Sequence, residues 1–257
     1  MSDFSLEGKV ALITGASRGI GQAIAIRYAQ AGAKVVVSSR KAENIQPVAA
    51  EIEAAGGEVL AVAAHVGRTE EIQGLVEQAL EAYGRIDVAV SNAGTNPHFG
   101  PLLTADEGQW DKILDTNAKG AFRLCKTVVP HMEAQGSGKI ITVASVAGLR
   151  PSAGMGIYSV SKAALIMLTQ VLAAELGSSN IQVNAIAPGL IKTRFSQVLW
   201  QTPEIARSIM DSIPQARFGE PEDVAGLALF LASPASDYVN GAVFLVDGGL
   251  HASAVLG

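Results

Sequence analysis

Hydrophobic residues along this chain gather in short continuous runs, and longer segments with a helical period lie between them. Such runs are typical of parallel strands that are covered on both faces, because a strand with one wet face alternates apolar and polar residues. They predict seven strands, at 10–14, 34–39, 58–64, 86–91, 139–145, 181–187 and 242–247.

The segments between the runs predict helices. In the first of them Ile20, Ile24 and Tyr28 have the i, i+4, i+8 spacing of one helix face. Strand–helix alternation predicts an α/β fold, with a single Rossmann-like domain over 1–257 and a doubly wound parallel sheet of about seven strands. Ligands of such sheets bind at the carboxyl ends of the strands.

One predicted helix, at 159–176, is apolar around most of its circumference, with six consecutive apolar residues at 163–168. Such a helix needs cover on more than its sheet side. A second subunit is the simplest cover, and burial under loops of the same chain is the alternative.

Composition narrows the class of protein. Hydrophobic residues make up 49% of the chain and charged residues 17%, which allows a large core. The net charge of −5, without a long basic run, argues against a nucleic-acid or anionic-membrane partner. The single cysteine, Cys125, permits no disulfide within the chain, and the histidines at 65, 98, 131 and 251 show no metal-ligand spacing with it.

Targeting signals of the usual kinds are not found in the sequence. The N-terminus "MSDFSLEGKV" is acidic and lacks the apolar stretch of a signal peptide, and the tail "HASAVLG" matches no retention or peroxisomal tripeptide. No apolar run approaches the ~18 residues of a membrane span. We therefore expect a cytoplasmic protein.

A glycine-rich turn, "LITGASRGIGQA", joins the first strand to the first helix, with glycines at 15, 19 and 21. Glycine lets the backbone approach a pyrophosphate, whose charge a helix N-terminus favours. Many strand–helix turns need glycine for geometry alone, but the place of this one favours a dinucleotide site.

A second candidate is "YSVSK", in which Tyr158 precedes Lys162 by four residues. On a helix the two side chains share a face, and a nearby ammonium would lower the pKa of the phenol. Taken alone, the pair is better explained as a half-buried tyrosine and a solvated lysine.

Six motifs in order resemble the short-chain dehydrogenase/reductase family: "TGASRGIG", "SNAG" at 91–94, Asn117 in "DTNAKG", Ser145 in "ITVASVAG", "YSVSK" at 158–162 and "NAIAPG" at 184–189. "VVVSSRKAEN", "AHVG" and "VSNAGTNPHFG" are similar to its NADP-dependent carbonyl reductase/retinol dehydrogenase group. The chain departs from the family at Ser91, usually asparagine, and at His65, where many members have the aspartate of an Asp-Val pair that contacts adenine.

The resemblance implies four catalytic residues. Tyr158 would be the acid/base and Lys162 would lower its pKa and hold the nicotinamide ribose. Ser145 would bind the substrate oxygen, and Asn117 would hold a water near Lys162. The alternative for Asn117 is a structural bond to the backbone inside a helix, and the two roles can coexist.

The resemblance also implies the residues of a cofactor site, in which Ile191 (through its backbone) and Thr193 would hold the carboxamide. The set is Gly15, Ser17, Arg18, Gly19, Ile20, Gly21, Ser39, Arg40, His65, Val66, Asn92, Ala93, Gly94, Tyr158, Lys162, Pro188, Gly189, Ile191 and Thr193.

The end of the second strand indicates which cofactor is preferred. An NAD-binding fold places an acidic residue there, whereas this chain has Ser39 followed by Arg40. A guanidinium binds phosphate in a bidentate, charge-assisted way, and Arg18 would reach the same phosphate. We predict NADPH/NADP+, the alternative being that Arg40 is only a solvated residue.

The family's variable substrate lid falls at about 190–213, where bulky apolar residues predict an apolar or aromatic substrate. The candidate substrate residues are Ser145, Tyr158, His98, Phe99, Phe195, Leu199 and Trp200. The lid residues would serve equally well at a subunit interface, and His98 is more simply a solvated loop residue.

The sequence thus predicts an NADPH-dependent reductase of apolar or aromatic ketones and aldehydes, without metal, assembled as a homotetramer. A 3-oxoacyl-carrier-protein reductase shares every motif but needs a basic patch, for which Lys192 and Arg194 are weak evidence. A non-catalytic dinucleotide-binding regulator is a further alternative.

Overall fold

The sheet of this protein contains seven parallel strands in the order β3-β2-β1-β4-β5-β6-β7, as seen in a computed structural model that describes residues 3–253, apart from the side chain at position 205. The predicted strands and the fold class are confirmed, with shifts of one to two residues at most ends. The strands are β1 Val10–Thr14, β2 Lys34–Ser39, β3 Val59–Ala63, β4 Val88–Ser91, β5 Gly138–Val143, β6 Ile181–Pro188 and β7 Val243–Val246.

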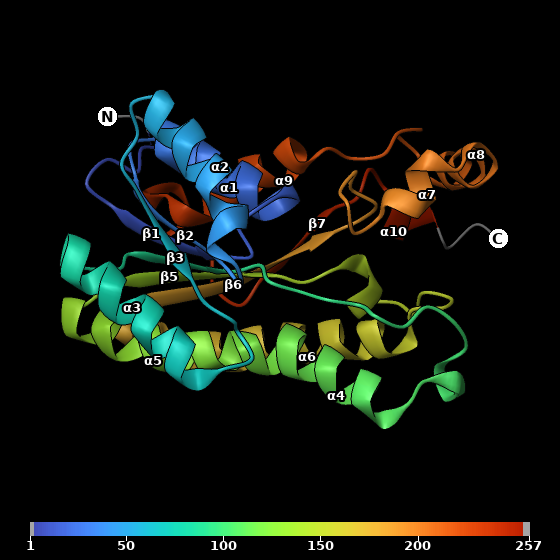
Figure 1. Cartoon of the computed structure of the whole chain (residues 1–257), viewed down its shortest axis with the longest axis horizontal. Helices are drawn as coiled ribbons and strands as arrows, with labels where there is room; N and C mark the ends of the chain where they lie inside the picture. Colours follow the sequence, from blue (N-terminus) through green and yellow to red (C-terminus); the bar gives the residue numbers. More distant parts are fainter. Residues whose placement is uncertain (1–2, 254–257) are drawn as a thin grey trace.

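Helices cover both faces of the sheet (Figure 1). One face carries α1 Gly19–Gln30, α2 Ala42–Ala54 and α9 Pro221–Ala232, and the other carries α3 Thr69–Tyr83, α5 Gly120–Gln135 and α6 Gly156–Leu176. Alternate residues of β1 therefore enter different cores: Ala11 and Ile13 pack toward α1 and α9, and Val10 and Leu12 toward α3 and α5. This two-sided burial explains the continuous apolar runs.

Most of the remaining elements cluster at one end of the molecule, beyond the carboxyl ends of the strands (Figure 1). They include the short turns η1 Leu102–Thr104 and η3 Val146–Gly148, and α4 Glu107–Leu114, which continues into the π-helical turn η2 Asp115–Lys119. The predicted lid folds as α7 Gln197–Gln201 and α8 Pro203–Ser212, beside α10 Leu250–Ser253. The last residues of the tail, where a targeting tripeptide was sought, lie outside the described residues.

Strand order places a crevice at this end. The chain winds outward from β1 to β3 and then returns to β4 on the other side of β1. The loops after β1 and β4 thus diverge, which is where doubly wound sheets bind ligands. Across the crevice, the Asn92 amide donates to the carbonyls of Thr14 (3.2 Å) and Gly15 (2.9 Å). The first strand and the fourth are thereby fixed relative to each other at the predicted cofactor site.

The long helix α6 is apolar enough, by length and composition, to cross a membrane together with the turn that follows it. A core helix passes the same test, and α6 packs along β6 and against η2 and η3. Its opposite side exposes Val160, Met167 and Val171. The apolar residues of α6 are therefore divided between the core and the surface.

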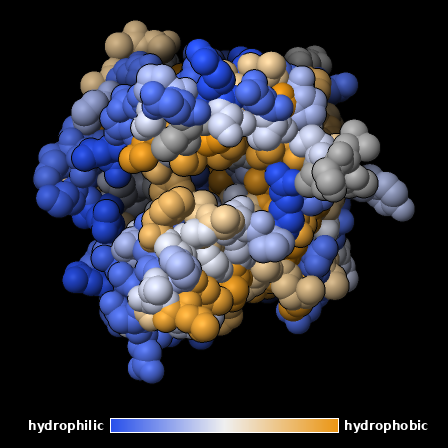
Figure 2. Space-filling model, turned by 90° about the vertical axis from the view of Figure 1, so that its right-hand side faces the viewer, coloured by the Kyte–Doolittle hydropathy of each residue, from blue (hydrophilic) through white to orange (hydrophobic). Residues whose placement is uncertain are grey.

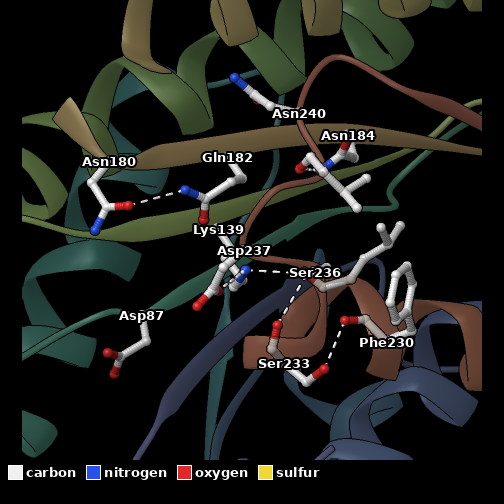
Figure 3. A network of polar contacts seen from close by, with 12 residues as sticks. Asp87, Lys139, Asn180, Gln182, Asn184, Phe230, Ser233, Ser236, Asp237 and Asn240 are labelled. Carbon is white, nitrogen blue, oxygen red and sulfur yellow. Dashed lines mark hydrogen bonds and ion pairs between the residues drawn. The ribbon is translucent and has the colours of Figure 1, made fainter. Parts of the chain in front are cut away.

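A polar network holds the chain between α9 and β7 against the sheet (Figure 3). Asn240 accepts from the Val183 N–H (2.8 Å) and donates to the Ala173 carbonyl (2.9 Å). Lys139 donates to Ser236 (3.1 Å) and forms an ion pair with Asp237 (2.8 Å). These contacts fix the β7 edge relative to β5 and β6.

Candidate active site

Tyr158 and Lys162 lie on the first two turns of α6, four residues apart on one face as the sequence predicted. The Lys162 Nζ lies 5.6 Å from the centroid of the Tyr158 ring. Lys162 is only 3% exposed, and its ammonium donates to the Val143 carbonyl at the end of β5 (2.7 Å). The explanation of the lysine as a solvated residue is therefore wrong.

The proton affinities of the pair differ from those expected. Burial raises the pKa of the Tyr158 phenol to about 12, while a hydrogen bond with Ser145 acts in the opposite direction. Burial also lowers the pKa of Lys162 to about 8. The expected lowering by Lys162 is not seen, because its ammonium is directed at Val143 and the phenol is desolvated. At neutral pH the phenol of the protein by itself is a proton donor.

Ser145 lies two residues beyond the end of β5, where its side chain caps the short turn η3. Its Oγ accepts from the Ala147 N–H (3.1 Å) and shares a hydrogen bond with Tyr158. The hydroxyl is thereby held beside the phenol. Two oxygens that can donate to one substrate oxygen are brought together.

Asn117 is buried within the π-helical turn, a rare conformation that is frequent at functional sites. Its Oδ1 accepts from the Thr95 N–H (2.8 Å), and its Nδ2 donates to the Thr95 carbonyl (3.0 Å) and to Ser161 (3.0 Å). Asn117 thus has the structural role considered as an alternative, within η2 rather than in an α-helix. Sequence reasoning missed Ser161, although it directly precedes Lys162 in "YSVSK".

The glycine turn packs tightly against the loop that follows β4. Gly15 has a φ of 66°, and a Cβ at this position would lie 2.8 Å from the Ala93 Cα. A Cβ at Gly21 would collide with the Gly15 carbonyl and the Asn92 amide. These glycines allow the backbone to close tightly at the start of α1, the arrangement that a pyrophosphate requires.

Gly94 lies close to two of the catalytic side chains. A Cβ at this position would lie 3.5 Å from the Asn117 Oδ1 and 3.7 Å from the Lys162 Nζ. Both atoms therefore lie near one point next to the backbone of the "SNAG" motif. The residues present fit a nicotinamide cofactor that runs from the glycine turn to Lys162.

A pocket of about 390 Å³ lies at the other end of this path, beyond the ends of β2 and β3. Four cationic side chains line it, of which the sequence predicted Arg18 and Arg40 but not Lys41 and Arg68. Both missed residues follow predicted strand ends, which is the signal that could have identified them. The full lining is Ser17, Arg18, Ser39, Arg40, Lys41, Asn44, His65, Arg68 and Glu71.

His65 lines this pocket, but its ring is already engaged. The backbone N–H of Gly67 donates to the Nδ1 of the His65 ring (2.9 Å). The backbone N–H of His65 donates to the Glu71 carboxylate (2.7 Å). Nδ1 accepts, so the neutral ring carries its proton on Nε2. His65 thus presents a donor where the family's aspartate would present an acceptor.

The predicted carboxamide segment follows β6. The Gly189 N–H donates to the Val246 carbonyl (2.9 Å), and Ile191 forms a bridge to Gly219. The lid is tied to this segment, because the Trp200 indole donates to the Thr193 carbonyl (3.1 Å). Trp200 therefore packs on the segment predicted to hold the carboxamide.

On the substrate side, the Phe195 ring packs against the ring of Tyr158, with centroids 5.5 Å apart. Phe99 is 73% exposed and covers Gly154. The expectation of a solvated His98 is wrong, since this residue is buried and its Nε2 hydrogen-bonds Thr104 (3.2 Å). Figure 2 shows a hollow in this end of the molecule with hydrophobic side chains gathered around it.

The fold and this arrangement of Asn117, Ser145, Tyr158 and Lys162 define an oxidoreductase of the nicotinamide-dinucleotide class. A model of the family described as "Enoyl-(Acyl carrier protein) reductase" matches residues 15–251. Dehydrogenase/reductase SDR family member 4 of Oryctolagus cuniculus is 46% identical over 244 residues, 95% of this chain and 94% of that protein. The same family member of Homo sapiens is 46% identical over 95% of this chain and 88% of its own length.

Solved structures agree. A gluconate 5-dehydrogenase from Burkholderia cenocepacia, in complex with NADP and tartrate, has a TM-score of 0.93 at 33% identity and covers 97% of this chain and 98% of its own. Levodione reductase has a TM-score of 0.92 at 33% identity, with 96% and 98% covered. The chain belongs to the short-chain dehydrogenase/reductase family, enzymes that act on CH–OH and carbonyl groups with a nicotinamide dinucleotide.

Proposed function

We propose that this enzyme is an NADPH-dependent reductase of apolar or aromatic ketones and aldehydes, working reversibly. The observation that supports this most is the contact of the Phe195 ring with the Tyr158 ring, whose centroids lie 5.5 Å apart. An apolar wall beside a proton donor favours a carbonyl compound with an apolar or aromatic substituent. A panel of aryl, alkyl and polar ketones, followed by NADPH absorbance, tests the proposal.

Tyr158 acts as the acid in reduction and as the base in oxidation. Its phenol, with a pKa of about 12, stays protonated at neutral pH and gives its proton to the carbonyl oxygen. Ser145 donates a second hydrogen bond to that oxygen and stabilises the charge that develops there. When bound, the nicotinamide supplies the hydride in reduction and, in its oxidised form, a positive charge that favours the phenolate.

Lys162 and Asn117 connect Tyr158 to solvent in this proposal. Both amide hydrogens of Asn117 are used by Thr95 and Ser161, so a water would bind to its Oδ1. The point beside Gly94 lies within 3.7 Å of both the Asn117 Oδ1 and the Lys162 Nζ. A water near this point would carry the proton that Tyr158 needs to regain.

NADPH is the proposed cofactor because of the charge around the pocket after β2. Ser39 offers no carboxylate, and its hydroxyl donates to the Lys41 carbonyl (3.2 Å). The single carboxylate of the lining, Glu71, is paired with Arg68 (2.7 Å). Lys41 forms an ion pair with Glu43 (3.2 Å), so Arg18 and Arg40 remain to bind a 2′-phosphate. Comparison of kcat/KM with NADPH and with NADH tests this choice.

A 3-oxoacyl-carrier-protein reductase is the second candidate, favoured by the carrier-protein description of the matching family. An acidic carrier requires exposed cations beside the site, and Lys192 and Arg194 are exposed there. Glu220 pairs with Lys192 at 2.6 Å, which weakens this patch. Comparison of an acetoacetyl thioester with an aryl ketone separates the two functions.

We further propose a homotetramer in the cytoplasm. The exposed apolar side chains of α6, together with Phe122 on α5 and Leu245 on β7, are the surfaces that other copies would cover. Sedimentation as a monomer at micromolar concentration would exclude this assembly. Imaging of the tagged protein in its own cells tests the location.

A further inference from the structure

Two segments that are distant in the sequence meet at one largely buried guanidinium, that of Arg123 on α5. The first is the loop at 65–67, which follows β3 and borders the cationic pocket. The second is the π-helical turn η2, which carries Asn117. Only 11% of the Arg123 side chain is exposed, so the charge must be matched by its neighbours.

Arg123 binds both segments at once. Its Nη2 donates to the Asp115 carboxylate (2.7 Å), and its Nη1 donates to the backbone carbonyls of Asp115 (3.3 Å) and Val66 (3.3 Å). Asp115 is the first residue of η2 and Val66 the middle residue of the loop. The planar fork of arginine suits such a three-acceptor site, whereas a lysine ammonium would hold only part of it.

Close packing shows that the junction tolerates little movement. A Cβ at Gly67 would lie 2.8 Å from the Asp115 Oδ2, and a Cβ at Gly120 would lie 3.1 Å from the Val66 Cγ2. The loop and the turn therefore touch through glycines on both sides of the ion pair. A shift of one segment displaces the other.

The Asp115 carbonyl has a second role, because it accepts the Gly120 N–H that closes the π-helical turn. Arg123 thus binds the same oxygen that determines the shape of η2. That shape directs the Asn117 amide toward Thr95 and Ser161. A change at Arg123 reaches Asn117 through this one backbone group.

We propose that Arg123 is a positioning residue that couples the adenosine end of the cofactor site to the catalytic Asn117. It holds the loop at 65–67 and the turn η2 in one register, so that binding at the adenosine end stabilises the geometry of the proton path. The coupling rests on the role proposed above for Asn117, whereas the anchoring of the loop does not.

The test uses Arg123→Leu, which removes all three bonds, and Arg123→Lys, which keeps the charge. We expect Arg123→Leu to lower kcat about tenfold and to weaken binding of 2′,5′-ADP, which occupies only the adenosine end, by a similar factor. Arg123→Lys restores kcat to within about threefold through Asp115, but leaves 2′,5′-ADP binding weak because the Val66 contact is lost.

A double-mutant cycle with Asn117→Ser separates positioning from general destabilisation. If Arg123 acts through Asn117, Arg123→Leu lowers kcat in the native background but not in the Asn117→Ser background. Arg85→Leu is the matched control, since Arg85 pairs with Asp87 (2.6 Å) near the opposite ends of the strands. This control keeps native kcat and 2′,5′-ADP affinity whatever it does to the melting temperature.

Additive losses of kcat in the cycle, or unchanged 2′,5′-ADP binding in Arg123→Leu, would overturn the coupling. Native kcat in Asn117→Ser would instead overturn the proton path and the coupling with it, while the 2′,5′-ADP measurement would still decide whether Arg123 anchors the loop. Melting curves of each variant show that the comparison is made on folded enzyme. If Arg123→Leu does not fold, the split between kcat and 2′,5′-ADP affinity in Arg123→Lys decides, and native values of both would overturn the proposal.

Discussion

The two ends of the cofactor path are built on different physical principles. At the adenosine end, Arg18, Arg40 and Lys41 stand around a pocket on side chains that solvent reaches. At the catalytic end, Lys162 is buried and the phenol of Tyr158 is desolvated, so that burial shifts the pKa of both groups. An exposed charge can bind a ligand with little loss of stability. A buried charge has a shifted pKa, and its burial destabilises the fold unless other groups compensate it.

The difference implies that the two ends can be altered separately. Substitutions at the adenosine end should change which cofactor is used, and substitutions at the catalytic end should change turnover. The coupling through Arg123 sets the limit of this division.

The largest effect is expected for Tyr158→Phe. Removal of the phenol oxygen deletes the proton donor, so that kcat should fall by about 10²–10⁴-fold. Binding of NADPH, measured by the change in its fluorescence, should stay nearly native. Substantial reductase activity in this variant would show that another group gives the proton.

The pH dependence of kcat/KM should report the titration of Lys162. Its folded-state pKa of about 8 lies below the ordinary value of 10.5, so the ammonium is lost as pH rises through about 8. With NADPH limiting, kcat/KM for reduction should be level below pH 7 and fall above pH 8. Lys162→Arg keeps its charge and should remove this decline at a lower overall rate. A native profile that stays level to pH 9.5 would be the contrary result.

The cofactor preference should respond to changes after β2. Ser39→Asp places a carboxylate against the 2′-phosphate and should shift preference toward NADH. Arg40→Ala should raise the KM for NADPH by about tenfold and leave that for NADH almost unchanged. Lys34→Ala, at the opposite end of the same strand, is the control. A loss of kcat in Arg40→Ala would contradict the division between the two ends.

The smallest effect is expected for Phe195→Ala. Loss of the ring beside Tyr158 should raise the KM for an aryl ketone by several-fold, up to about tenfold, because apolar contact area is lost. A small aliphatic ketone should be affected less. Tyr238→Ala removes an exposed aromatic ring elsewhere and serves as the control. Equal changes with both substrates would place Phe195 outside the substrate pocket.

Local patterns predicted what depends on neighbours in sequence. Continuous apolar runs identified the strands because both faces of the sheet are covered, and the four-residue spacing placed Tyr158 and Lys162 on one helix face. The resemblance to a family placed Ser145 and Asn117 in the same site. These inferences need only the period of an element and the order of the motifs.

Contacts across long separations were beyond the sequence. The raised pKa of Tyr158 comes from burial, which no local pattern reports. The bond from Asn117 to Ser161 joins residues 44 positions apart. Arg123 carries no motif at all, and only the packing of α5 brings it to Val66.

The central claim is that exposed cations select NADPH as the hydride donor, while buried groups on α6 supply the proton for reduction of a carbonyl. The most direct test is the ratio of kcat/KM for NADPH to that for NADH, measured with the native enzyme and one aryl ketone. We expect oxidation of NADPH that depends on the ketone. Because charge-assisted bonds to the 2′-phosphate favour NADPH, the ratio of the two kcat/KM values should be on the order of a hundred. Equal efficiency with the two cofactors, or no ketone-dependent oxidation of either, would contradict the account.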